Sequence, residues 1–260
     1  MLTVLSPAKT LDWTERKDLS LSQPVFEADA VRLARSARQL SMRALQDLMH
    51  ISPDLARLNR DRFRDFAEEP DGETLRAAVF AFAGDTYVGL EAKSLEEDAL
   101  RYAQNHLRIL SGLYGLLRPL DGIQAYRLEM GSRLKTRRGT NLYAYWGASL
   151  SKELNLQAEE TNSNWLLNCA SQEYFGAVDL KKLKLQVIMP KFLEERNGTA
   201  KTVGFFAKRA RGALARYVME HRITDPKDLG GFSYGGYEQR GAIDPDGGMV
   251  FARPYPALSA

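Results

Sequence analysis

The sequence predicts a mixed α/β fold: a single compact domain over residues 1–260, built from a mixed sheet flanked by helices. Short apolar runs of strand length alternate with longer segments whose apolar residues recur at helical spacing. The 260 residues, 44% of them hydrophobic, lie near the upper limit of what one core supports. No stretch has the composition of a linker, so we expect one domain.

The predicted strands are short and apolar. The opening run LTVLS is of strand length, and Pro7 ends it. The glycine-rich stretch 230–241 is typical of a loop that leads into an edge strand. Comparable apolar runs lie at 78–83, 165–169, 185–189 and 249–252. The sheet should therefore contain at least five strands.

Helical signals occur between these runs. A proline, Pro53, stands in the first turn of one predicted helix, where its missing N–H costs nothing. Ser94 is a predicted N-cap, and Glu97 completes a capping box with it. The predicted helices span residues 27–49, 52–66, 94–113 and 205–221.

The composition excludes several classes of protein. No run approaches the roughly 18 apolar residues of a membrane span, and the N-terminus lacks the features of a secretion signal, so we expect a cytoplasmic protein. The lone cysteine, Cys169, rules out an intramolecular disulfide framework. His50, His106 and His221 are too scattered for a ligand cluster. We therefore expect no metal and no cofactor.

Positive charge is concentrated in two segments, although the net charge is only +3. Between residues 101 and 140, eight basic residues accompany two acidic ones, and between 201 and 222 six accompany one. Such local excess is typical of a surface that meets polyanions.

Two motifs at predicted strand ends carry candidate site residues. Lys9 follows the first strand in SPAKT, where it could hold a phosphate or act as a base; a solvated loop lysine is the alternative. Asp85 follows the run 78–83 in a Gly-Asp pair, which could place a carboxylate at the same sheet edge or form a simple turn.

A third polar motif, NCASQEYF, follows the run 165–169. Asn168, Ser171 and Glu173 could line a polar pocket, or Asn168 or Ser171 could cap a helix whose first turn Glu173 strengthens. Cys169 has no histidine nearby in the sequence to act as its base, so we assign it inert burial.

The most distinctive segment is 111–131, SGLYGLLRPLDGIQAYRLEMG. Its glycines, Pro119 and the Asp-Gly pair predict a helix, a tight turn and a second short element. This is the outline of a helix-hairpin-helix, in which backbone N–H groups and Arg118 and Arg127 would bind phosphate. The alternatives are a structural turn with two exposed arginines, or a strand in YRLEMG.

Six motifs occur here in an order that resembles the YaaA family of peroxide-stress proteins, also called DUF328 or UPF0246: SPAKT, FAGDTYVGL, ILSGLYGLLRPLDGIQAYRLEMG, NLYAYWG, NCASQEYF and RGALARY. The resemblance implies a cytosolic protein that helps cells withstand hydrogen peroxide. It also implies a mixed α/β fold with a positively charged cleft, and DNA binding through a helix-hairpin-helix-like element.

These observations together predict a DNA-binding protein that contacts the phosphates of duplex or structured DNA with little sequence specificity. The alternative is an enzyme acting on a nucleotide or nucleic acid, with Lys9, Asp85 and Glu173 as charge clamp and general acid or base. An acidic protein partner is a third possibility. The predicted DNA-binding residues are Lys9, Arg118, Arg127, Arg133, Lys208, Arg209, Arg211 and Arg216.

Overall fold

An eight-stranded mixed sheet forms the centre of the molecule in a computed structural model that describes residues 1–16 and 19–256. Its strands are β1 (Leu2–Leu5), β5 (Leu107–Ser111), β6 (Gly115–Leu117), β8 (Trp165–Asn168), β9 (Gln186–Arg196), β10 (Thr199–Lys201), β11 (Glu238–Arg240) and β12 (Gly248–Pro254). The order is β11-β12-β9-β8-β1-β5-β6, and β10 pairs with β9.

The five inner strands β12, β9, β8, β1 and β5 run parallel to one another. The outer strands β11 and β6, and the hairpin strand β10, pair antiparallel. All four residues of β1 are buried, as expected for a central parallel strand covered on both faces. The mixed α/β class is confirmed.

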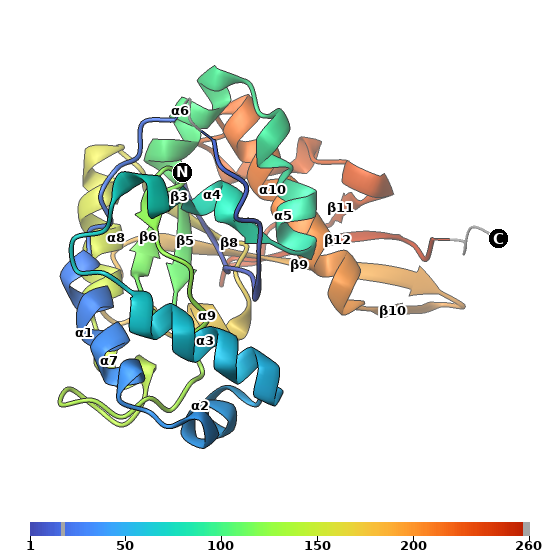
Figure 1. The fold of residues 1–260 in the computed structure, drawn as a ribbon. Helices are drawn as coiled ribbons and strands as arrows, with labels where there is room; N and C mark the ends of the chain where they lie inside the picture. Colours follow the sequence, from blue (N-terminus) through green and yellow to red (C-terminus); the bar gives the residue numbers. More distant parts are fainter. Residues whose placement is uncertain (17–18, 257–260) are drawn as a thin grey trace.

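Helices cover the sheet in groups. They are α1 (Glu27–Arg38), α2 (Met42–Met49), α3 (Pro53–Asp65), α4 (Ala78–Ala81), α5 (Asp85–Leu90), α6 (Glu97–His106), α7 (Leu142–Trp146), α8 (Ser149–Glu160), α9 (Gln172–Phe175) and α10 (Gly204–His221). Figure 1 shows α5, α6 and α10 together on one side, and α1, α2, α3 and α7 together on another. The hairpin of β9 and β10 extends away from the body (Figure 1).

Small elements complete the chain. Strand β2 (Thr10–Leu11) pairs with β4 (Phe82–Ala83), and β3 (Arg76–Ala77) pairs with β7 (Gly122–Ile123). The remaining turns are 3₁₀ helices at Gly72–Thr74, Ala92–Ser94, Pro226–Gly231 and Tyr234–Gly236.

The structure departs from three sequence-based predictions. The predicted helix 27–49 is two helices, because Ser41 caps α2 by accepting a hydrogen bond from the backbone N–H of Ala44. The predicted strand 78–83 is mostly the short helix α4. The predicted helix 94–113 ends at His106, and its second half is the buried strand β5. A continuous apolar run fits either a buried helix or a buried strand, so periodicity alone could not decide.

Candidate functional site

A cavity of about 390 Å³ opens beyond the carboxyl ends of β1 and β8. Parallel α/β sheets commonly bind ligands at this edge. The three polar motifs predicted at strand ends meet here, and α10 closes one wall. The ionisable and hydroxyl side chains of its lining include Lys9, Asp85, Ser171, Glu173, Lys208 and Arg211.

Hydrogen bonds link the segments that follow β1 and β8 in the lining of the cavity. The Oγ of Ser6 accepts a hydrogen bond from the backbone N–H of Ser171 at 2.9 Å, and it lies 3.3 Å from the Ser171 Oγ. The hydroxyl of Tyr87 donates to the carbonyl oxygen of Ser6 at 3.1 Å. These bonds join three segments that are distant in the sequence, and so fix the relative positions of the motifs.

Lys9 lies at the rim and forms an ion pair with Glu129. Its Nζ is 3.1 Å from Glu129 Oε1, and the guanidinium of Arg127 contacts the same oxygen at 3.0 Å. Arg127, predicted to bind phosphate from the hairpin, is only 14% exposed. It neutralises a carboxylate behind Lys9 instead.

Asp85 is the first residue of α5, and it is paired. Its Oδ1 accepts a hydrogen bond from Nε of Arg209 at 3.3 Å, and the same guanidinium lies over the ring of Phe205. The pair joins the start of α5 to α10. Arg209 therefore balances a carboxylate at the cavity, and only part of its charge is available to a ligand.

Two further cations project from α10. Lys208 and Arg211 are three residues apart, so they lie on the same face of the helix. Neither side chain has a hydrogen-bond or ion-pair partner within residues 1–16 and 19–256, and Nε of Arg211 is buried. A half-buried guanidinium without a counterion is unusual, because desolvated charges are normally paired.

Glycines bring α10 close enough to α5 to shape this wall. A Cβ at Gly89 would overlap the carbonyl oxygen of Arg209, and a Cβ at Gly212 would overlap that of Thr86. The two helices therefore touch backbone to backbone. This contact fixes the position of Arg209, and of the cations beside it, relative to α5.

Glu173 belongs to α9 and also holds the segment at Gly131 by a hydrogen bond. Its Oε1 accepts a hydrogen bond from the N–H of Gly131 at 3.0 Å. Ser171 caps α9, accepting from the N–H of Tyr174, and lines the cavity as well. Asn168 accepts a hydrogen bond from the N–H of Ala170 at 3.0 Å and is absent from the lining of the cavity, so its role is to hold the turn.

Cys169 lines the cavity, but its thiol is expected to be unreactive. Burial raises the pKa of its thiol to about 12, although nearby Arg211 acts in the opposite direction. Burial also raises the pKa of Tyr87 and Tyr174. These groups stay neutral at physiological pH, so the charge of the site comes from its lysines, arginines and carboxylates.

The segment 111–131 differs from the predicted helix-hairpin-helix. It contains the end of β5, then β6 and β7, and no helix. Gly112 lies against the backbone of Leu128, and Gly115 has a φ of +69° and packs on Trp146. The glycines therefore allow close packing against the backbone at Leu128 and against the side chain of Trp146 in α7.

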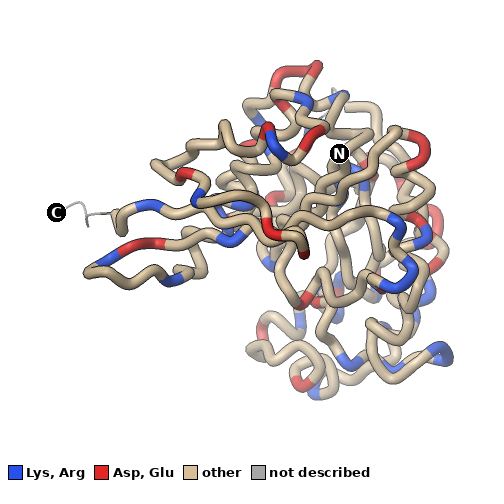
Figure 2. Tube along the Cα trace, turned by 180° about the vertical axis from the view of Figure 1, so that it is seen from behind, with Lys and Arg blue, Asp and Glu red and all other residues tan. Residues whose placement is uncertain are grey.

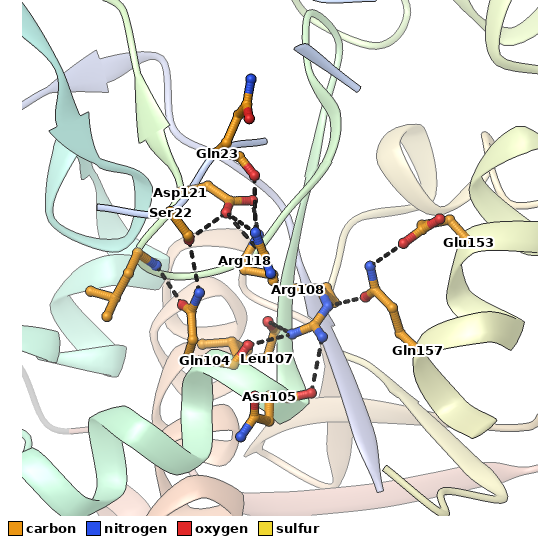
Figure 3. Close-up of polar contacts among 11 residues, drawn as sticks. Ser22, Gln23, Gln104, Asn105, Leu107, Arg108, Arg118, Asp121, Glu153 and Gln157 are labelled. Carbon is orange, nitrogen blue, oxygen red and sulfur yellow. Dashed lines mark hydrogen bonds and ion pairs between the residues drawn. The ribbon is translucent and has the colours of Figure 1, made fainter. Parts of the chain in front are cut away.

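Arg118 is engaged within the protein (Figure 3). Its guanidinium contacts the fully buried carboxylate of Asp121 at 3.0 Å and donates to the carbonyl oxygen of Gln23 at 2.9 Å. Figure 3 also shows Arg108, which donates to Gln157 and to the carbonyl oxygen of Leu107. Much of the basic excess in 101–140 is therefore used internally.

Arg216 has hydrogen-bond partners within the protein, whereas Arg133 has none in the described residues. Arg216, predicted as a DNA-binding residue, donates to the carbonyl oxygen of Glu91 and to the hydroxyl of Ser94, both at 2.8 Å, so its guanidinium is engaged within the fold. Arg133 is exposed and has no partner in the described chain. Figure 2 shows basic and acidic residues interspersed over many segments.

Two negative findings concern the described chain. No group of three or more His, Cys, Asp or Glu side chains there has the arrangement of a metal site. None of the helices in residues 1–16 and 19–256 has the length and apolar character to cross a membrane.

Sequence reasoning missed Ser6, Tyr87 and Glu129 as parts of the site. Ser6 precedes Pro7 at the end of a strand, a position that could have singled it out. Tyr87 and Glu129 reach the site only through tertiary contacts, and nothing local in the sequence marks them.

Comparison with known proteins places the chain in a family. Residues 1–242 match the family model described as peroxide stress protein YaaA. A UPF0246 protein of Ruegeria pomeroyi is 60% identical over 255 residues, covering 98% of this chain and 99% of the relative. A UPF0246 protein of Caulobacter vibrioides is 50% identical over 257 residues, covering 98% of this chain and all of the relative. The chain belongs to the YaaA family of peroxide stress proteins, the UPF0246 proteins.

Proposed function

We propose that this protein binds DNA in the cytoplasm during peroxide stress, and that Lys208 and Arg211 at the cavity supply its principal phosphate contacts, with Lys9 beside them. The family supports the physiological setting. The binding role rests on the charge and geometry of the cavity.

The observation that carries the proposal is the state of Arg211. Its guanidinium is half-buried at the cavity, and neither it nor Lys208 has an internal partner in the described residues. A buried unpaired charge lowers stability, and such a cost is commonly tolerated at functional sites. A phosphate group would supply the missing counterion and accept charge-assisted hydrogen bonds from the guanidinium.

Other cations play secondary roles in this proposal. Arg133 is exposed and has no partner in the described residues. It lies two residues after Gly131, whose N–H donates to Glu173 in the cavity lining, so Arg133 can extend the contact surface beyond the cavity. Arg209 contributes through its partly exposed guanidinium. Contacts made by ammonium and guanidinium groups to phosphates carry no sequence information, so unrelated DNA sequences should bind alike.

The experiment is a salt titration of binding to unrelated duplexes, using wild type and the double variant Lys208→Ala/Arg211→Met. Methionine keeps an apolar stem in place of the arginine chain. The logarithm of the binding constant should fall linearly with the logarithm of salt concentration, and the slope should decrease by about 2 in the variant, or about 1 per lost phosphate contact.

A matched control removes the same charge elsewhere. Lys181 and Arg57 are exposed and do not line the cavity. The double variant Lys181→Ala/Arg57→Met should keep the wild-type slope. Equal slopes for all three proteins, or no salt dependence in wild type, would refute the proposal.

An enzyme acting on a nucleotide or nucleic acid is the second candidate, favoured by one observation: Lys9, Asp85 and Glu173 all line the same cavity. Carboxylates and an amine around one reacting centre can transfer protons. Incubation with mononucleotides and oligonucleotides, followed by mass spectrometry, tests it. Product formation that Asp85→Asn and Glu173→Gln abolish would support turnover, and unchanged substrates would exclude it.

A further inference from the structure

We propose that the cavity takes one nucleoside monophosphate unit, either the end of a DNA strand or a nucleotide extruded from a duplex, rather than a stretch of intact backbone. This inference rests on the proposed function and names the ligand of the same site. Three features of the cavity lead to it.

The first feature is depth. Arg211 lines the cavity and is half-buried, so a phosphate must enter the cavity to contact its guanidinium. The volume of about 390 Å³ is at the lower end of the range of roughly 300–1,000 Å³ for small-molecule sites. A duplex, whose major groove alone is about 12 Å wide, stays outside such a space.

The second feature is the mixture of charges. Asp85 and Glu173 line the cavity together with the cations. A strand threaded through the cavity would bring several successive phosphates to these carboxylates, which repel them, whereas a strand end or one extruded nucleotide need place only a single phosphate inside. A strand end presents a free sugar hydroxyl, and the base of either a strand end or an extruded nucleotide presents N–H donors. Carboxylates accept hydrogen bonds from such groups.

The third feature is an apolar groove next to the cavity. This second hollow, of about 320 Å³, shares Ala83, Gly84 and Tyr87 with the first. Its lining includes the aromatic residues Phe80 and Phe82 and the exposed Val88. Gly84 lies where the two hollows meet and has no side chain to separate them.

These positions match the parts of a nucleotide. The phosphate lies against Arg211 and Lys208, the sugar crosses near Gly84, and the base lies on the apolar groove. Apolar and aromatic surfaces hold bases with little preference among them, because every base has a flat π face. The arrangement therefore selects a nucleotide unit over a phosphate group alone.

Equilibrium dialysis with deoxyadenosine monophosphate, deoxycytidine monophosphate and inorganic phosphate tests this on the full chain. Both nucleotides should bind at least tenfold more tightly than inorganic phosphate. Arg211→Met should lose at least tenfold for all three ligands. Val88→Asn should lose the preference for nucleotides and keep phosphate binding. Val25→Asn is the control, because Val25 lines neither hollow and is similarly exposed, at 48% against 55% for Val88.

Competition experiments then separate this inference from DNA binding itself. Mononucleotide should displace a labelled linear duplex, and covalently closed circular DNA should bind at least tenfold more weakly than the same circle nicked. A closed circle with one mismatch, which eases extrusion, distinguishes an extruded nucleotide from a strand end.

The outcomes are distinguishable. If closed circles bind as tightly as nicked and mismatched ones and mononucleotide does not compete, this inference fails and DNA binding stands. If mononucleotide binds with the stated preference and no DNA binds, the proposed function fails and the nucleotide site stands. Equal affinity for nucleotide and inorganic phosphate overturns the inference.

Discussion

Gly212 of α10 lies directly against the carbonyl oxygen of Thr86 in α5, with no room for a side chain between the two backbones. This contact, with the equivalent one between Gly89 and Arg209, sets how closely the helix that carries Lys208 and Arg211 approaches the start of α5. The spacing of the cavity wall therefore depends on a glycine.

Substituting this glycine should damage both stability and binding. Gly212→Ala forces the helices apart, and overpacking of this kind costs typically about 1–3 kcal/mol of unfolding free energy. Chemical denaturation measures the loss. Gly204→Ala, at the start of the same helix and with nothing within 4 Å of an added Cβ, should leave stability unchanged or slightly higher. Equal effects of the two variants would contradict the packing role.

The sequence predicted some elements well for identifiable reasons. Helix α3 has a serine cap and a proline in its first turn, and α10 has a long helical pattern, so both were found within a residue or so. The strands β1 and β8, apolar throughout and followed by a polar motif, were found in the same way. Local sequence signals were sufficient to predict an element where they fitted only a helix or only a strand.

The candidate site was predictable only in part. Lys9 and Glu173 were found because residues that follow neighbouring parallel strands meet at one edge of a sheet. Asp85 lines the same cavity although the run before it is mostly the helix α4. Arg118 and Arg127 both form ion pairs within the fold, which the sequence does not reveal, because it shows positive charges without showing the carboxylates that pair with them. The sequence identifies Asp121 as a turn residue, but its burial depends on tertiary packing, which the sequence does not show.

Loss of Arg118 should weaken the fold. The carboxylate of Asp121 is 0% exposed, and Arg118, 32% exposed, is its ion-pair partner. Because Ser22 and the backbone N–H of Arg118 also donate to Asp121, we expect Arg118→Met to cost about 1–3 kcal/mol, less than a fully orphaned buried charge. Urea denaturation measures it. Arg101→Met, which removes exposed pairs, should cost at most about 0.5 kcal/mol. An unchanged free energy of unfolding in Arg118→Met would contradict the role of Arg118 in stabilising the buried carboxylate of Asp121.

Cys169 should not respond to peroxide. Its pKa of about 12 leaves only about one thiol in ten thousand ionised at pH 8, and the side chain is buried. Iodoacetamide or hydrogen peroxide should modify it only after denaturation, as mass spectrometry would show. Rapid modification of the native protein would instead indicate a redox sensor.

The same thiol predicts a pH dependence of stability. The pKa of the thiol in the folded protein is above the ordinary value of about 9. The contribution of the neutral thiol to the free energy of unfolding is therefore complete below pH 9 and is lost as the pH rises towards 12. The difference in unfolding free energy between wild type and Cys169→Ala should therefore shift against wild type across this interval. A constant difference would show that the thiol titrates normally.

Glu194 should be essential for the start of α10. It is buried, accepts hydrogen bonds from the hydroxyl of Tyr237 and from the N–H of Val203, and lies 3.6 Å from Nε of Arg253. Glu194→Ala leaves the buried arginine without its carboxylate, which costs roughly 3–5 kcal/mol in comparable cases. Thermal melting should show it, whereas Glu195→Ala, at the half-exposed next position, should melt like wild type.

The most direct test of the central claim compares Arg211→Met with Arg118→Met in one DNA-binding assay, with thermal melting of both proteins. The claim is that the arginine without a partner, not the arginine paired within the fold, binds phosphate. It predicts that Arg211→Met melts no lower than wild type and loses at least about tenfold in affinity at low salt, as expected for a charge-assisted contact. Arg118→Met should melt lower and, while folded, bind DNA like wild type. The reverse pattern, with affinity lost in Arg118→Met and retained in Arg211→Met, would contradict the claim.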